Sequence, residues 1–394
     1  MFRELNQTKE NFYEKFATSK YVGFDLYNTL NQFHKLAFSK LVFKSLNKYL
    51  IKNKNYPTEI ETETFVPHYC VKGLFVDVPN GNLIKINSSK QVTNALHGDK
   101  VLGFTDLQRI YGKKRNIHDV TIKENETPRS IRTAREIGIG SCFNRLIHLK
   151  EKKSVRLGTP AQIFEDLREA SNYNFIELGE DSYFPEFSSN LDQYLQNNSK
   201  SLKMLFSYLN KSDKKVFLLT NSPPNVSEKT LTHLLGQDWK QYFDLILTNA
   251  QKPYFYCKET KTSFYHPFEE KKVNLGDNQR FKYGNAYELM DFLEVDSCEK
   301  VVFFGDNPIG DIRQSKINCN WSTVAVVSEL APEKTEMGDG YALFGKDRKR
   351  LWGKYLYCGD KLSYWGKMIQ NYSDFQVPSI ECFTEELFSR LRFY

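Results

Sequence analysis

Short runs of apolar residues recur along this chain, and each run ends in polar residues. The runs lie at residues 21–25, 216–222, 243–249, 300–306 and 321–327. Segments with apolar residues at helical spacing separate them, as at residues 34–54. Because strands buried on both faces read as continuous apolar runs, the alternation predicts an α/β fold with a doubly wound parallel sheet.

A long insertion follows the first of these strands. Within it, Asn80-Gly81 stands between two apolar runs, which predicts a β-hairpin over residues 72–87. The last segment of the chain is rich in Trp and Tyr, and we expect it to pack on the core. The predicted organisation is a core at residues 15–33 and 205–345, an inserted domain at residues 34–204 and an aromatic tail at residues 346–394.

Composition narrows the class of protein. The chain has 394 residues, of which 40% are hydrophobic, as in a globular protein. We expect no membrane span, because no run of about 18 apolar residues occurs. The seven cysteines show no CxxC pair or zinc spacing, and the first residues show no apolar signal segment, so we expect a cytoplasmic location. The net charge of +7 suits an anionic ligand. The sequence shows no stripe of basic residues interleaved with aromatics, so it gives little support for nucleic acid binding.

Polar residues with matching chemistry stand where four of the predicted strands end. Each alone has an ordinary explanation, since a strand often ends in a capped turn and Thr-Asn-Ser often caps a helix. Ligands of open α/β sheets, however, bind beyond the carboxyl ends of the strands. Carboxylates, hydroxyls, an amide and a lysine together suit phosphoryl transfer supported by Mg²⁺. The candidates are Asp25, Thr220, Asn221, Ser222, Lys252, Asp306 and Asp311.

These residues lie in segments that resemble the four signature motifs of the haloacid dehalogenase (HAD) superfamily. The local sequences are similar to its 5′-nucleotidase branch, and most similar to the type 1 5′-nucleotidase domain-containing proteins, relatives of cytosolic purine 5′-nucleotidase. The resemblance covers most of residues 18–385. It is carried by residues 23–30, 72–77, 220–222, 250–255 and 304–312.

The resemblance implies a nucleophile and a metal site. Asp25 would attack phosphorus and form an aspartyl-phosphate, and it would also bind Mg²⁺. Asp306 would hold Mg²⁺, Asp311 would be a further ligand or lie behind the ligands, and the backbone carbonyl of Tyr27 could also bind the ion. The fold implied is a HAD-like core, in which residues 34–204 form a cap domain.

The resemblance also implies how a phosphate would be held. Thr220 and Asn221, with Ser222 beside them, would hydrogen-bond the phosphoryl oxygens. Lys252 would screen the charge between nucleophile and phosphate. The expected substrate is a nucleoside monophosphate or another phosphomonoester. Relatives often self-associate, so the resemblance leaves open whether this chain forms a homo-oligomer.

One residue departs from the family pattern. The first motif is D-x-D-x-T, but this chain has Asp25-Leu-Tyr27-Asn-Thr29. The missing second Asp normally protonates the leaving group and then activates water. A phenol with a pKa of about 10 is a poor substitute near neutrality, and the loss of a general acid/base costs about 10² to 10⁴ in rate. Three interpretations stay open: a slow Mg²⁺-dependent nucleotidase, a pseudoenzyme that binds nucleotide or phosphate and acts through protein partners, and a scaffold with a relic site.

Recognition of the base would come from the inserted domain. Its aromatic residues could stack on a base, and its arginines could meet a phosphate, although most such residues serve as core or as solvated surface. The aromatic candidates are Phe143, Tyr173, Phe175, Tyr183 and Phe184, and the basic candidates are Arg129, Arg132, Arg135 and Arg145.

Overall fold

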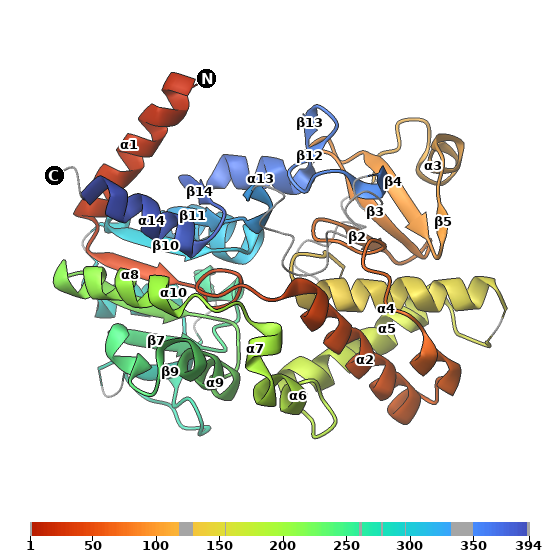
Figure 1. Ribbon diagram of the computed structural model, residues 1–394, viewed down its shortest axis with the longest axis horizontal. Helices are drawn as coiled ribbons and strands as arrows, with labels where there is room; N and C mark the ends of the chain where they lie inside the picture. The colour runs from red at the N-terminus through yellow and green to blue at the C-terminus, as the bar shows by residue number, and fades with distance from the viewer. Residues whose placement is uncertain are drawn as a thin grey trace. The chain divides into compact units, whose positions relative to one another are not determined.

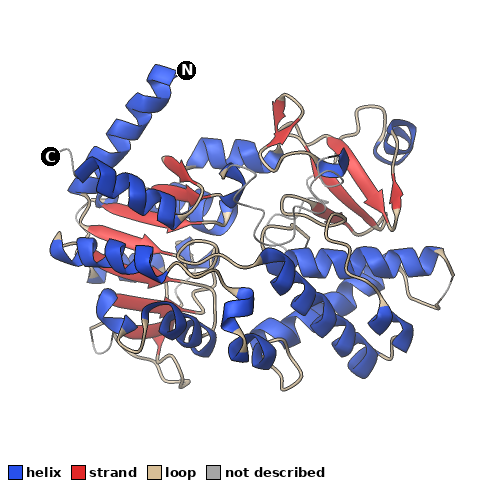
Figure 2. Cartoon of the chain, in the orientation of Figure 1, coloured by secondary structure: helices blue, strands red, loops and turns tan. Residues whose placement is uncertain are grey.

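The computed structural model describes residues 2–117, 129–153, 155–259, 262–276, 279–295, 297–331 and 350–391. The chain divides into two compact units. Unit 1 comprises Met1–Gln32, Leu195–Ala331 and Met368–Tyr394, and unit 2 comprises Phe33–Tyr194 and Pro332–Lys367. Figures 1 and 2 show a mostly parallel sheet with helices in unit 1, and helices with a smaller sheet in unit 2.

Unit 1 is built, within the described residues, on one eight-stranded sheet (Figure 1). Neighbouring strands pair in parallel, except that β8 runs antiparallel to β9 at one edge. The predicted α/β class with a doubly wound parallel sheet is confirmed. The strand order is β14 (Phe375–Val377), β11 (Ser322–Val326), β10 (Val301–Gly305), β1 (Tyr21–Phe24), β6 (Lys215–Leu219), β7 (Leu245–Thr248), β9 (Arg280–Tyr283) and β8 (Phe264–Tyr265).

Helices cover both faces of this sheet. Successive side chains of a strand point to opposite faces, and β1 shows this clearly. Val22 and Phe24 pack in the apolar layer of the first helix group, whereas Tyr21 packs in the layer of the second. The first group is α1 (Phe2–Thr18), α8 (Ser199–Lys211), α9 (Pro224–Leu235) and α14 (Ile380–Leu391), and the second is α10 (Ala286–Phe292) and α11 (Gln314–Cys319). Short helical turns lie at η3 (Trp239–Tyr242), η4 (Tyr254–Tyr256), η5 (Cys298–Lys300), η6 (Pro308–Arg313) and η7 (Ser328–Leu330).

A buried lysine closes the carboxyl end of α1. The Nζ of Lys214 donates to the carbonyl oxygens of Phe16, Ala17 and Ser19, at 2.9, 3.0 and 2.6 Å. Burial lowers the pKa of this amine. The last carbonyls of a helix lack intrahelical partners, so Lys214 supplies the donors that α1 needs to dock on the sheet.

Replacing Lys214 by Met should therefore destabilise unit 1. The change removes the Lys214 donor from the buried Ser19 carbonyl, whereas the Phe16 carbonyl keeps the Ser19 hydroxyl as a donor. Loss of a donor to a buried carbonyl costs about 1–3 kcal/mol of unfolding free energy. Urea denaturation measures the effect, and the matched control is Lys211→Met at an exposed position of α8. Equal stability of the two variants would show that Lys214 does not hold α1.

Unit 2 combines helices with an antiparallel sheet of order β2-β3-β4-β5. The predicted hairpin is present, because Phe75 pairs with Ile84 and Asp77 with Asn82. Its strands are β2 (Phe75–Asp77), β3 (Asn82–Ile86), β4 (Val92–His97) and β5 (Lys100–Val101). Its helices are α2 (Lys35–Lys54), α3 (Phe104–Tyr111), α4 (Ala134–Glu151), α5 (Pro160–Asn172), α6 (Phe184–Ser189) and α7 (Leu191–Tyr194), with turns η1 (Thr58–Thr62) and η2 (Tyr173–Glu177).

The structure divides the aromatic tail that we expected on the core. Residues 350–367 belong to unit 2, and the residues from 368 onward belong to unit 1, where β14 extends the sheet beside β11. In unit 2, Trp365 stacks on Phe75, and the Nζ of Lys85 donates to the carbonyls of Trp352 and Tyr357. The expected boundary at residues 345 and 346 lies outside the described residues. The tail contributes β12 (Tyr357–Cys358), β13 (Lys361–Leu362) and α13 (Tyr364–Tyr372).

Among the described residues, no helix combines the length and apolar character needed to cross a bilayer.

Candidate active site

The candidate site lies at the carboxyl ends of the central strands of unit 1. Strands β10, β1 and β6 are neighbours, and their register aligns Phe24 with Phe304 and with Leu218. The residues that follow these strands therefore meet at one edge of the sheet. The backbone N–H of Asp25 donates to the carbonyl of Phe304 at 2.9 Å, which fixes Asp25 beside the end of β10.

Lys252 joins two of the carboxylates expected at the site. Its Nζ donates to Asp25 Oδ1 at 2.9 Å, to Asp311 Oδ1 at 2.5 Å and to the carbonyl of Leu219 at 2.8 Å. The lysine side chain is only 4% exposed. Burial disfavours its charged form, but the two carboxylates outweigh burial and raise the pKa of Lys252. The ammonium group is thus held charged between two acids.

Asp25 is buried in the same network. Burial raises the pKa of Asp25 to about 6, since Lys252 lowers it only in part and Asp311 raises it further. A carboxylate that is stripped of water and bonded to an ammonium group is held in one orientation. Perturbed carboxyl groups of this kind are typical of functional sites.

Three carboxylates gather closely enough to share a cation. One ligand oxygen each from Asp25, Asp306 and Asp311 lies within 4.8 Å of the others. Mg²⁺ prefers carboxylate oxygens and needs few of them from the protein, so this donor set fits it. Asp311 is braced on both sides, because its Oδ1 accepts from Lys252 and its Oδ2 accepts from the Asn307 N–H at 3.0 Å. Asp25 and Asp306 are therefore the first candidates for direct ligands.

The polar turn after β6 holds Lys252 through its backbone. The Asn221 side chain accepts from the Lys252 N–H at 2.6 Å and donates to the Lys252 carbonyl at 2.8 Å. Thr220 is buried, and its Oγ1 accepts from the Ser222 N–H at 3.2 Å. Of the expected phosphate-binding residues, Asn221 thus contacts Lys252 directly, and Thr220 and Ser222 flank it in the same turn. In this arrangement, the Asn221 amide is used to position the lysine.

Comparison with known proteins decides the family. The sequence model of the 5′-nucleotidase family matches residues 15–342. The chain belongs to the 5′-nucleotidase family. The resemblance stated from the motifs is thereby confirmed.

Two human relatives of this 5′-nucleotidase family member illustrate the similarity. Human 5′-nucleotidase domain-containing protein 1 is 28% identical, and the alignment covers 94% of this chain and 90% of that protein. Human 5′-nucleotidase domain-containing protein 2 is 24% identical, over 79% of this chain and 61% of that protein. Among solved structures, a phosphonoacetaldehyde hydrolase-like protein of Oleispira antarctica is 11% identical with a TM-score of 0.38, covering 95% of this chain and 93% of that one.

The side chain of Tyr27, which replaces the second acid of the family motif, is half-buried and packs against the core of unit 1. Its ring contacts the apolar layer that includes α8 and α9. Its hydroxyl forms a 2.6 Å hydrogen bond with Oγ1 of Thr230, a fully buried residue of α9. The phenol is therefore a packing and hydrogen-bonding group of the core. The sequence signalled the substitution but not the direction of the side chain.

Gly305 and Asn307 support the site, and sequence reasoning did not single them out. A Cβ atom on Gly305 would lie 2.2 Å from Asp311 Cβ, so only glycine lets Asp311 approach the end of β10. The Asn307 side chain accepts from the N–H groups of Ile309 and Gly310, which starts the η6 turn that carries Asp311. The Gly-Asp-Asn-Pro segment was the available signal.

Gly305→Ala should displace Asp311 and weaken divalent cation binding. Overpacking of this kind costs about 1–3 kcal/mol of stability. We expect a lower melting temperature and, in calorimetric titration with Mg²⁺, a lower affinity than the native chain. Gly103→Ala, at an open position of unit 2 with nothing near its Cβ and an ordinary φ of −77°, is the control for unspecific loss of glycine. An unchanged Mg²⁺ affinity in Gly305→Ala would remove Asp311 from the metal site.

The residues expected to read a base serve largely as core of unit 2. Phe143 is fully buried against Phe164, and Phe175 stacks on Tyr183 with ring centroids 4.5 Å apart. Tyr173 packs on Tyr49, and Phe184 packs edge-on against Tyr183. These contacts account for the packing of the five aromatic candidates.

The arginines of unit 2 also have protein partners. Arg145 pairs with Glu63 and with Asp99. The guanidinium groups of Arg129 and Arg135 lie over the rings of Phe164 and Phe175, and Arg132 pairs with the buried Glu136. None of these contacts identifies a base-binding residue.

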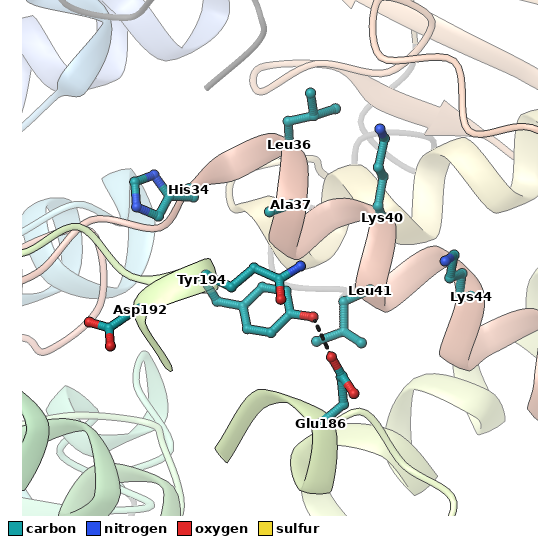
Figure 3. Close-up of a pocket in the computed structure, with 10 residues that line it drawn as sticks. His34, Leu36, Ala37, Lys40, Leu41, Lys44, Glu186, Asp192 and Tyr194 are labelled. Atoms are coloured by element: carbon teal, nitrogen blue, oxygen red, sulfur yellow. Dashed lines mark hydrogen bonds between the residues drawn. The ribbon is translucent and has the colours of Figure 1, made fainter. Parts of the chain in front are cut away.

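Unit 2 contains a pocket that sequence reasoning missed. It has a volume of about 760 Å³ and lies between the start of α2 and the α6–α7 segment (Figure 3). Tyr194 donates a hydrogen bond to Glu186 at 3.0 Å in its wall. The lining includes lysines of α2 as well as carboxylates of α6 and α7, so its charges favour no single class of ligand. The lining residues are His34, Leu36, Ala37, Lys40, Leu41, Lys44, Glu186, Asp192, Gln193 and Tyr194.

Proposed function

We propose that this member of the 5′-nucleotidase family is a slow, Mg²⁺-dependent phosphohydrolase that acts on nucleoside monophosphates through an aspartyl-phosphate on Asp25. The observation that carries the proposal is the buried network of Asp25, Lys252 and Asp311, with Asp306 in reach of the same cation. Family membership supports the class of substrate.

The residues of unit 1 suit the first chemical step. Asp25 is fixed by its backbone bond to Phe304 and by Lys252, so its carboxylate is oriented before a substrate arrives. The Lys252 ammonium lies against the nucleophile, where it would offset charge that develops on the phosphoryl oxygens. Thr220 and Ser222 stand at the next strand end, where they could donate to those oxygens. Mg²⁺, held by Asp25 and Asp306 with Asp311, and in our proposal by the Tyr27 carbonyl, would supply further neutralisation of phosphate charge.

Tyr27 sets the expected rate. Because its hydroxyl is hydrogen-bonded to Thr230 and its ring packs against the core, it does not replace the acid that protonates an alkoxide leaving group. Loss of such a group lowers rates by about 10² to 10⁴. The same observation favours a second candidate function, a pseudoenzyme that binds nucleotide or phosphate and acts through protein partners.

Phosphate release tests the proposal. The full chain is incubated with a panel of nucleoside monophosphates and an activated aryl phosphate, with Mg²⁺ or with a chelator. We expect Mg²⁺-dependent release that is faster from the aryl phosphate, because its leaving group needs little protonation. No release from any substrate, together with saturable nucleotide binding, would favour the pseudoenzyme.

A further inference from the structure

We propose that Asp25 accepts a phosphoryl group from acyl phosphates and retains it, so that the chain accumulates a long-lived aspartyl-phosphate. The inference rests on the proposed function, because it takes Asp25 as the nucleophile. It goes further by naming a donor class, phosphoryl donors whose leaving group departs as a stable anion. It also names the step at which the reaction stops.

The position of the Tyr27 side chain carries the inference. Two residues after Asp25, the phenol turns into the apolar layer beside α9, and its oxygen is 2.6 Å from Thr230 Oγ1. Thr230 is fully buried, so this hydrogen bond ties the phenol to the helix layer. Tyr27, two residues after the nucleophile, thus offers neither an acid nor a base to a bound phosphoryl group.

The other ionisable groups that interact with Asp25 in the described part of unit 1 are poorly suited to take a proton from water. Lys252 is a charged donor and cannot accept a proton. Asp311 accepts from Lys252 and from the Asn307 N–H. Burial raises the pKa of Tyr256 well above its ordinary value, so this phenol stays neutral. Among the described residues of unit 1, the remaining acid of the cluster is Asp306, which we assign to the cation.

Formation of the acyl phosphate on Asp25 needs no acid when the donor is itself an acyl phosphate. A carboxylate oxygen of Asp25 forms a bond to phosphorus, and the bond from phosphorus to the donor oxygen breaks. The electron pair stays on that oxygen, which leaves as a carboxylate such as acetate. A carboxylate is a stable anion near neutrality, so no proton has to be supplied. The missing acid therefore does not slow this step.

Hydrolysis of the acyl phosphate does need a base. A water oxygen must form a bond to phosphorus while the bond from phosphorus to the Asp25 oxygen breaks and its electron pair returns to the carboxylate. The water must lose a proton, and without a positioned acceptor that proton passes to solvent. General base catalysis is worth about 10² to 10⁴ in rate, so its absence retains the phosphoryl group on Asp25.

Mass spectrometry tests this directly. The full chain is incubated with acetyl phosphate and Mg²⁺, freed of donor, and sampled over time. We expect the mass gain of one phosphoryl group on the peptide that contains Asp25, removed by hydroxylamine as an acyl phosphate should be. Absence of this mass gain in the native chain, with aryl phosphate release that depends on Asp25, overturns the inference and leaves the proposed function standing. If neither signal depends on Asp25, both fail.

Three variants at one position identify the cause of retention. Tyr27→Asp should shorten the lifetime of phosphoryl-Asp25 by about 10² or more. Tyr27→Asn introduces a side chain of the same size as Asp but without a base, so it should keep the long lifetime. Tyr27→Phe keeps the aromatic ring against the core and should keep the long lifetime as well. Thermal melts identify any variant that fails to fold, and Tyr27→Phe remains informative in that case. A tenfold longer lifetime in Tyr27→Phe than in the native chain would make the hydroxyl a participant in hydrolysis and overturn the inference.

Discussion

Replacing Asp25 by Asn is expected to abolish phosphate release and phosphoryl transfer to the chain. The amide is nearly the same size, but its oxygen is a far weaker nucleophile than a carboxylate, and it loses the charge that pairs with Lys252. We expect a fall of at least about 10³ in release from an aryl phosphate, since the step that forms the covalent intermediate is removed. Steady-state phosphate assays and intact mass spectrometry measure the two effects.

The matched control for Asp25→Asn is Asp238→Asn, the same change at an exposed position of unit 1. It should leave both signals as they are in the native chain. Asp25→Asn should also remain folded, because the substitution removes a buried charge whose pKa is raised by burial. If folded Asp25→Asn released phosphate as fast as the native chain, another residue would perform the chemistry.

Replacing Lys252 by Met should lower both stability and activity. The lysine side chain is 4% exposed and Asp311 is 2% exposed, so the change leaves buried carboxylates without their cation. Breaking a buried pair in this way costs about 3–5 kcal/mol of unfolding free energy. Because Mg²⁺ brings positive charge to the same carboxylates, added Mg²⁺ should raise the melting temperature of Lys252→Met more than that of the native chain.

Lys215→Met provides the comparison for Lys252→Met. Lys215 is 51% exposed and pairs with Asp244 at the surface, where an ion pair contributes about 1 kcal/mol or less. Urea denaturation of the two variants, with and without Mg²⁺, separates a buried from an exposed pair. If Lys252→Met were no less stable than Lys215→Met, the network around Asp25 would not have the energetic role described here.

The central strands could be predicted because they are buried on both faces. Residues 21–25 and 300–306 read as apolar runs, and β1 and β10 lie there. The edge strands escaped prediction for the opposite reason. Edge strand β8 and its neighbour β9 fall within the polar stretch after Lys252, and β9 (Arg280–Tyr283) alternates charged with aromatic residues. Strand β14 was hidden in the aromatic tail.

The members of the candidate site could be predicted, but their contacts could not. Strand-end placement brought Asp25, Lys252, Asp306 and Asp311 together, because carboxyl ends of parallel strands share one edge of the sheet. Two contacts depend on the path of side chains through the fold. The Asn221 amide binds the Lys252 backbone, and the Tyr27 hydroxyl bonds to Thr230, a residue of α9 far away in the sequence.

The measurement that tests the central claim most directly is a crystal structure of the full chain grown with Mn²⁺, examined by anomalous scattering. Mn²⁺ accepts the same oxygen ligands as Mg²⁺, and its anomalous signal locates the ion independently of the surrounding protein density. We predict one strong peak within bonding distance of the Asp25 and Asp306 carboxylates, next to Asp311 and Lys252. Strong peaks elsewhere with none at these carboxylates would contradict the assignment of this site to metal-assisted phosphoryl transfer.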